Sequence, residues 1–140
     1  MKSYILGGLA VIGLLVATRP LVAHHSFAAE FDADKPITLK GIVTKVEWTN
    51  PHVWFYINVK DEKTGDVTNW GAEMGPPHGL QRRGWRQNTL QIGEEVTVSG
   101  SLAKNGTKRL NASKVTLTAT GARPGETLDA ASSGSSEKVD

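Results

Sequence analysis

Two adjacent histidines, His24 and His25, follow directly after an apolar leader that ends in Ala23. If the leader is cut after Ala23, His24 becomes the first residue and offers both a free amine and an imidazole. Nitrogen donors of this kind chelate copper and other borderline metals. His52 could supply a further nitrogen in space. The sequence therefore indicates a copper (or zinc) site at His24, His25 and His52, unless the first two only flank a cleavage site and His52 caps a turn.

A polar and aromatic strip is the second candidate site. Its members occupy every second position: Asn50, His52, Trp54 and Tyr56. Alternate side chains of a strand share one face, so we expect the three rings to lie together on the outer face, opposite an inner face formed by Val53, Phe55, Ile57 and Val59. Exposed rings could stack on a sugar or another flat small molecule. The alternative is that Phe27 and Phe31 fold back and cover them.

Three arginines, Arg82, Arg83 and Arg86, lie within five residues. Guanidinium groups bind phosphates and carboxylates, often in a bidentate manner. The sequence therefore predicts Arg82 and Arg83 as ligand-binding residues. A solvated helix face is the alternative interpretation of the same cluster.

Signals for enzymatic chemistry are few. The chain has no cysteine, no Gly-x-Ser-x-Gly nucleophile motif and no glycine-rich phosphate loop. Oxidative copper chemistry at His24 is the one enzymatic possibility that the residues offer. The pattern favours a non-enzymatic binding or accessory module of unknown ligand.

Residues 1–23 have the three parts of a secretory signal: Lys2, the apolar run 5–17 and the small Ala23. Arg19 and Pro20 interrupt the run before it reaches the roughly 20 residues that a membrane anchor needs. We therefore expect a periplasmic or secreted protein with no anchor after cleavage. A competing cut after Ala28 would remove both N-terminal histidines.

Charge makes nucleic acid an unexpected partner. Lys2 and Arg19 belong to the leader, so the mature chain keeps 14 basic residues against 14 acidic ones. A nucleic-acid binder is expected to carry a basic surface. The partners we expect instead are a small molecule, a glycan or an envelope protein.

Periodicity divides the rest of the chain into three parts. Residues 24–35 form an N-terminal extended segment, 36–118 a β-rich domain, and 119–140 a flexible tail poor in large apolar residues. The expected strands are 37–48, with a bulge at Gly41, then 53–59, 67–74, 95–103 and 109–117. A short helix is expected at 78–86, with Leu80 and Trp85 buried.

This order of elements resembles the oligonucleotide/oligosaccharide-binding fold, a small five-stranded Greek-key barrel with a helix between strands 3 and 4. Such a fold specifies no activity by itself. The segments HHSFAAEFD at 24–32, TNPH at 49–52 and RRGW at 82–85, together with Gly41, are also similar to a family of small exported bacterial proteins of unknown function. That resemblance covers nearly the whole secreted domain and implies no catalytic residue.

Overall fold

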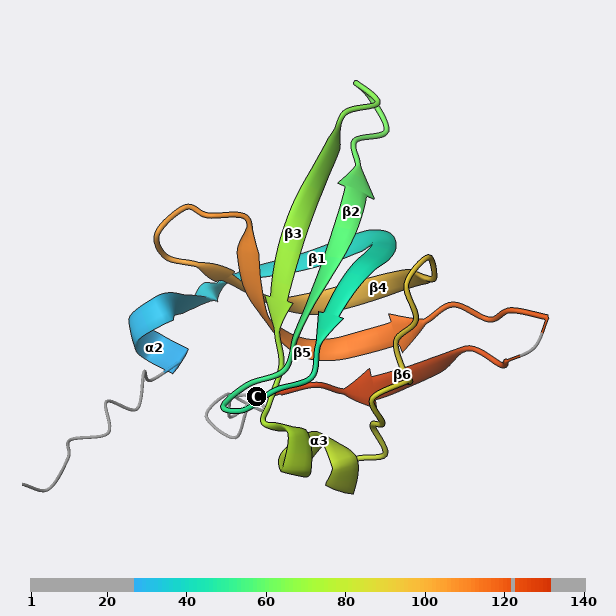
Figure 1. Ribbon diagram of the computed structural model, residues 1–140. Coiled ribbons are helices and arrows are strands. Elements are labelled where there is room, and N and C mark those ends of the chain that lie inside the picture. Colours follow the sequence, from blue (N-terminus) through green and yellow to red (C-terminus); the bar gives the residue numbers. More distant parts are fainter. Residues whose placement is uncertain (1–26, 122, 132–140) are drawn as a thin grey trace, which may run out of the picture.

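The computed structural model describes residues 27–121 and 123–131, which form six strands and two short helices (Figure 1). The elements are, in chain order, α2 (Phe27–Glu30), β1 (Phe31–Glu47), β2 (Trp54–Lys60), β3 (Val67–Glu73), α3 (Pro77–Arg82), β4 (Glu95–Ala103), β5 (Arg109–Leu117) and β6 (Glu126–Asp129). All six strands belong to one sheet in the order β3-β2-β1-β4-β5-β6. The protein is therefore mainly β, as the sequence predicts.

Strand β1 is shared between the two halves of the sheet. Its first part pairs with β4 and its last part with β2, both antiparallel, and Ile42 has a partner on each side. Just before this point, Gly41 passes so close to β2 that an added Cβ would lie 2.5 Å from the carbonyl oxygen of Asn58. Only glycine fits such an approach.

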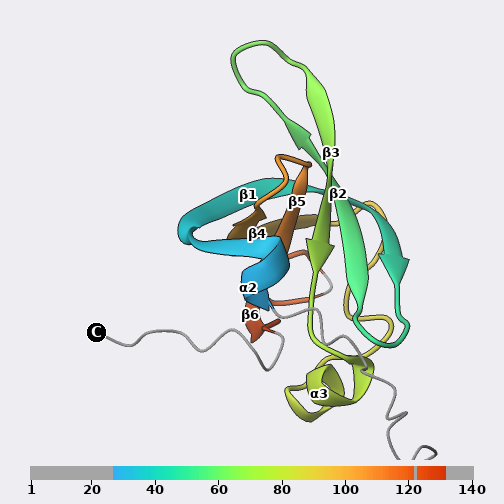
Figure 2. The same ribbon diagram turned by 90° about the vertical axis from the view of Figure 1, so that its left-hand side faces the viewer.

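A parallel pairing of β3 with β5 closes the first five strands into a ring. Residues Gly71–Glu73 pair with Arg109–Asn111. Figure 2 shows the ring with the β2–β3 hairpin projecting beyond it. In this pairing the two buried polar residues Glu73 and Asn111 lie directly opposite each other.

The core fills the inside of this ring. In the second strand region, Val53, Phe55 and Ile57 are fully buried, which confirms the inner face predicted from alternation. Strands β4 and β5 contribute aliphatic side chains, and Leu80 and Trp85 are fully buried at one end of the core. The indole nitrogen Nε1 of Trp85 donates a hydrogen bond of 2.7 Å to the carbonyl of Asp129.

Element bounds differ from prediction most at the start of β1 and at α3, and by one residue at the end of β1, at both ends of β2 and at the end of β3. Strand β1 begins at Phe31, six residues before the expected start. A bulge was predicted around Gly41; the register with β2 shifts just after it, between Val43 and Lys45, whereas pairing with β4 runs without a shift from Pro36 to Ile42. Helix α3 covers Pro77–Arg82 and stops before Gly84, whose φ of +94° favours glycine and ends the helix.

The predicted tail from residue 119 was wrong for its first part. Strand β6 pairs antiparallel with β5, and Ala130 after it is fully buried. Composition missed this strand because its attachment depends on backbone hydrogen bonds, the small buried Ala130 and a single large apolar side chain, Leu128, that packs against the core. The leader, His24, His25 and residues 132–140 lie outside the described residues.

Candidate functional site

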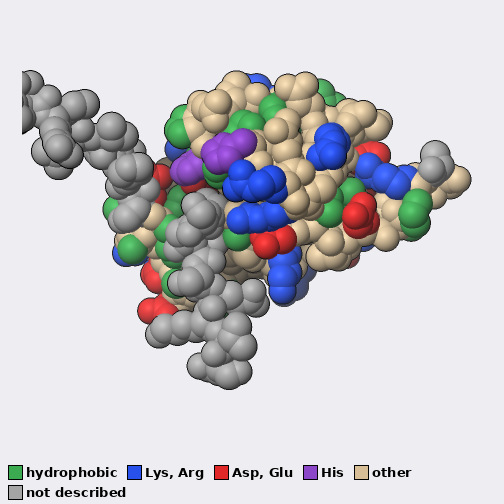
Figure 3. All heavy atoms as spheres, turned by 90° about the horizontal axis from the view of Figure 1, so that it is seen from below, with side chains coloured by type: hydrophobic (Ala, Val, Ile, Leu, Met, Phe, Trp, Pro, Cys, Tyr) green, Lys and Arg blue, Asp and Glu red, His purple; other side chains and the backbone are tan. Residues whose placement is uncertain are grey.

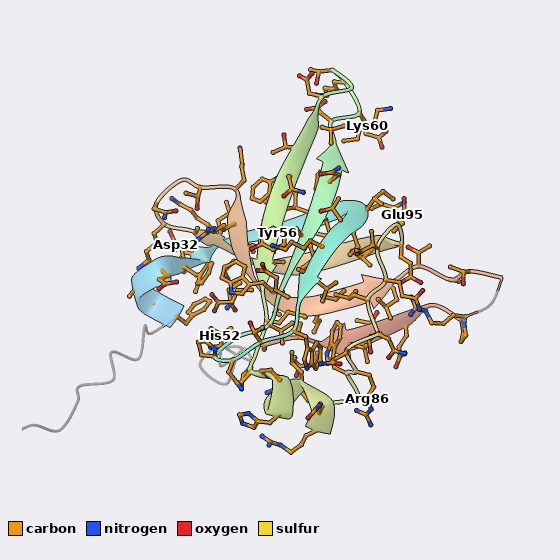
Figure 4. All side chains as sticks on the ribbon, in the orientation of Figure 1. Asp32, His52, Tyr56, Lys60, Arg86 and Glu95 are labelled. Atoms are coloured by element: carbon orange, nitrogen blue, oxygen red, sulfur yellow. The ribbon has the colours of Figure 1, made fainter. Side chains whose placement is uncertain are left out.

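Trp54 and Tyr56 of the predicted strip lie on the outer face of β2, and His52 lies in the loop just before this strand (Figure 4 labels His52 and Tyr56). All three are half-buried, while Val53 and Phe55 between them are buried. Gly71 of β3, the partner of Tyr56, leaves space for these rings. A Cβ added there would lie 3.2 Å from Tyr56 Cε1 and 3.6 Å from Trp54 Cζ3. A glycine on β3 thus accommodates the ring of Tyr56.

His52 is oriented by a buried carboxylate. Its Nδ1 lies 2.9 Å from Oε1 of Glu73, whose side chain is only 9% exposed. The same oxygen accepts a hydrogen bond of 3.3 Å from Asn111 Nδ2. The contact therefore joins a ring nitrogen of His52 to a carboxylate oxygen that Asn111 also contacts.

A cavity of about 340 Å³ adjoins this strip. Its lining comes from α2, the start of β1, Trp54 of β2 and the turn between β4 and β5. The lining residues are Ala29, Glu30, Phe31, Trp54, Ala103, Lys104, Asn105, Thr107 and Arg109. Cavities of this size hold small organic ligands.

Phe27 and Phe31, which were expected as a possible cover of the aromatic strip, lie beside the cavity. Phe31 is 3% exposed, and its ring stacks on that of Phe27 with centroids 5.9 Å apart. Phe31 lines the cavity together with Trp54. Because Trp54 is still half-buried and not fully buried, the segment forms a wall of the cavity and does not close it.

Arg109 lies on Trp54, with its guanidinium carbon 5.4 Å from the ring centroid. Such cation–π contacts are favourable and hold the guanidinium in place. The neighbouring Lys108 lies over Trp70 instead, at 5.2 Å from that centroid. Trp70 pairs with Ile57 of the inner face, so the two cations lie on opposite sides of the sheet.

Tyr56 belongs to a second cluster further along β2. Its hydroxyl donates to Glu47 Oε2 at 3.1 Å, and Lys45 Nζ lies 5.4 Å from the ring centroid and contacts the same carboxylate. Burial raises the pKa of Tyr56, and the hydrogen bond to Glu47 adds to this. Hydrogen bonds from Lys45 and then Tyr56 lower the pKa of Glu47.

The arginines predicted to bind a ligand lie elsewhere, around α3. Arg82 is exposed on the helix, Arg83 hydrogen-bonds the carbonyl of Ala131, and Arg86 hydrogen-bonds the carbonyls of Gln81 and Trp85. Figure 3 shows histidine side chains beside Lys and Arg on this face. Arg83 and Arg86 therefore bind backbone carbonyls of the chain itself.

Asn50, the remaining member of the predicted strip, is exposed in the loop before β2, next to a cis Asn50-Pro51 bond. It does not line the cavity.

The described ranges 27–121 and 123–131 contain no group of three His, Asp or Glu side chains that could hold a metal ion. His52 is the one member of the predicted metal set that lies in these ranges. Neither helix in the described part of the chain has the length and apolar character needed to cross a membrane.

Comparison with known families gives one match. Residues 13–114 match the profile of DUF6152, described as a family of unknown function. The chain belongs to the DUF6152 family. This membership confirms the resemblance to an uncharacterised family, and the family description states no activity, ligand or partner. No curated protein matches the chain.

Several residues of the site were not singled out from the sequence. Lys104, Lys108 and Arg109 fall in the six-residue stretch KNGTKR, which contains no acidic residue and could have been recognised as basic. Glu73 is another such residue: it is 7% exposed and contacts His52 and Asn111. These partners come from the loop before β2 and from β5, so no local pattern indicates them.

Proposed function

We propose that this chain is an exported, periplasmic, non-enzymatic binding module whose ligand site is the outer face of β2 and the adjoining cavity. Its ligand class is a small polar molecule or a glycan. The observation that carries the proposal is the cavity of about 340 Å³ with Trp54 in its wall. Aromatic side chains with nearby hydrogen-bonding groups are typical of sites for such ligands.

We further propose that the ring of five strands is an oligonucleotide/oligosaccharide-binding fold. Three features support this: the long β1 pairs with both β2 and β4, β3 pairs with β5, and α3 lies between β3 and β4. In that fold the face formed by strands 2 and 3 binds ligands. The position of Trp54 and the cavity agrees with that use of the fold.

Ligand screening with a matched pair of variants tests the binding proposal. The purified protein is titrated with a panel of neutral and acidic mono- and oligosaccharides by calorimetry. We expect Trp54→Ala to weaken binding about tenfold, the upper range for one aromatic contact. Trp70→Ala, on the opposite side of the sheet, should leave binding unchanged once circular dichroism shows that it folds. Absence of binding to every sugar, or an equal loss in both variants, would contradict the glycan proposal.

Copper (or zinc) binding at His24, His25 and His52 is a second candidate function. The observation in its favour is the contact between His52 Nδ1 and Glu73, because metal-binding histidines usually donate their other ring nitrogen to a carboxylate. Ala29 and Trp54 line one cavity, and His52 lies two residues from Trp54 on the same face. His24 lies three residues before Phe27, where α2 begins, so that segment could span at most about 10 Å towards this face.

Titration of the secreted protein with Cu(II) tests the metal proposal. We expect His24→Ala and His52→Ala each to weaken binding at least tenfold, the lower range for loss of a ligand or its support. His78→Ala is the control, because His78 is exposed on α3. Binding that is equally weak in all variants, or a mature protein that lacks His24, would rule this function out.

A further inference from the structure

Arg109 has a guanidinium group with unused hydrogen-bonding capacity at the cavity. Its contact with Trp54 uses the face of the ring and none of the five N–H donors. Among the residues that the structure describes, this guanidinium has no hydrogen-bond or ion-pair partner. Arg83, Arg86 and Arg123, by comparison, bind carbonyl or carboxylate oxygens of the chain. Arg109 is therefore held in position yet available to a ligand.

The surroundings of Arg109 favour an anion. Lys104 lines the same cavity and donates one hydrogen bond from Nζ to the carbonyl of Ala28, which leaves two of its three donors. Glu30 is the one carboxylate among the lining residues, and it already has an interaction partner. Two cations thus face one engaged carboxylate, so the cavity has an excess of positive charge.

The size and the polar lining of the cavity limit which anions could bind there. The cavity offers about 340 Å³, at the lower end of the range for small-molecule sites. Asn105 and Thr107 add polar groups to a wall that also contains Trp54 and Phe31. A planar carboxylate matches the fork of an arginine, while hydroxyl groups match the amide and hydroxyl side chains.

We propose that this cavity binds an acidic sugar, with Arg109 as the residue that recognises its carboxylate and Lys104 as a second cationic contact. The inference deepens the proposed binding function, on which it rests, by naming the ligand class. It also moves anion recognition from the predicted Arg82 and Arg83 to Arg109.

A pair of probes that differ at one group tests the inference. The complete protein is titrated with D-galacturonate and with D-galactose, which carries a hydroxymethyl group in place of the carboxylate. Arg109→Gln is compared with Lys108→Gln, the same loss of charge at the neighbouring residue whose side chain lies over Trp70 on the other side of the sheet. Inorganic phosphate is titrated separately to distinguish a phosphate site from a carboxylate site.

We expect galacturonate to bind at least tenfold more tightly than galactose, and Arg109→Gln to remove this preference, because a hydrogen bond to a charged group contributes about that factor. Lys108→Gln should behave as the unmodified protein. Equal affinity for both sugars with loss in Trp54→Ala would overturn the acidic-sugar inference and leave the binding function standing. Tighter, Arg109-dependent binding of phosphate, or no binding of galacturonate, would also overturn it.

Discussion

At the scale of single residues, two of the four tryptophans, Trp85 and Trp54, have different roles. Trp85 is fully buried and its indole N–H donates to the Asp129 carbonyl at 2.7 Å, whereas Trp54 is half-buried in the cavity wall. Buried indole groups contribute both packing and a satisfied hydrogen bond. The same residue type therefore stabilises the fold at one position and is available to a ligand at the other.

We predict that Trp85→Phe lowers the free energy of unfolding by about 2–3 kcal/mol, because it leaves a void and removes the donor to a buried carbonyl. Trp54→Phe, the matched change on the outer face, should cost less than about 1 kcal/mol. Urea unfolding followed by circular dichroism measures both. Equal losses in the two variants would contradict the division of roles.

The phenol of Tyr56 should titrate above its usual value, because burial and the hydrogen bond to Glu47 both raise its pKa. We predict that Glu47→Gln lowers the pKa of Tyr56 towards 10, since the acceptor loses its charge. Absorbance at 295 nm as a function of pH measures this on a protein that begins at His24, in which Tyr56 is the one tyrosine because Tyr4 belongs to the predicted leader. Glu62→Gln, in the exposed loop before β3, is the control and should leave the titration unchanged.

The side-chain burial along a strand could be predicted from the sequence, because it depends on the alternation of neighbouring residues. Alternation placed Val53, Phe55 and Ile57 inside and Trp54 and Tyr56 outside, and the burial values confirm it. The contact of His52 with Glu73 was not predictable, because it depends on which strand lies beside β2. Arg109 was missed for the same reason: its proximity to Trp54 depends on how β5 returns to β3.

At the scale of elements, β4 and β5 approach each other closely at Gly100. An added Cβ there would lie 2.0 Å from the carbonyl oxygen of Asn111, where the β4–β5 register shifts between Ser99 and Gly100. A backbone atom cannot move aside as a flexible side chain can. The position therefore requires glycine.

We predict that Gly100→Ala destabilises the protein by about 1–3 kcal/mol, the usual cost of forcing extra atoms into packed structure. Gly121→Ala is the matched control, because an added Cβ there meets no atom within 4 Å and φ is not positive. Thermal unfolding of both variants gives the comparison. A melting temperature for Gly100→Ala equal to that of Gly121→Ala would contradict this account of β4–β5 packing.

Boundaries were predictable for elements with strong alternation and clear turns. Strands 95–103 and 109–117 were predicted with the bounds that the structure has, because Val96, Val98 and the Asn105-Gly106 turn mark them. Strand β6 and the first residues of β1 lack this pattern. They join the sheet through pairing with neighbours whose identity only the folded chain determines.

At the scale of the whole molecule, closure of the ring links parts of the chain that are distant in sequence. Gly71–Glu73 meet Arg109–Asn111, and this contact positions both the Glu73 carboxylate and Arg109 for the outer face of β2. The order of predicted elements indicated a five-stranded arrangement, yet it could not specify this parallel pairing. The candidate site therefore depends on how the strands pair in the folded chain, and no single sequence motif contains all of its residues.

The start of the mature chain is also a property of the whole molecule, and we predict that the secreted form begins at His24. The cut is expected after Ala23, the small residue that closes the predicted leader of residues 1–23. Intact-mass spectrometry of the protein recovered from the periplasm, with N-terminal sequencing, measures the start. Ala23→Pro, which should block this cut, is compared with Ala17→Ser as the control. A mature protein beginning at Ala29 would remove His24 and His25 and leave the cavity at Trp54 and Arg109 as the remaining candidate site.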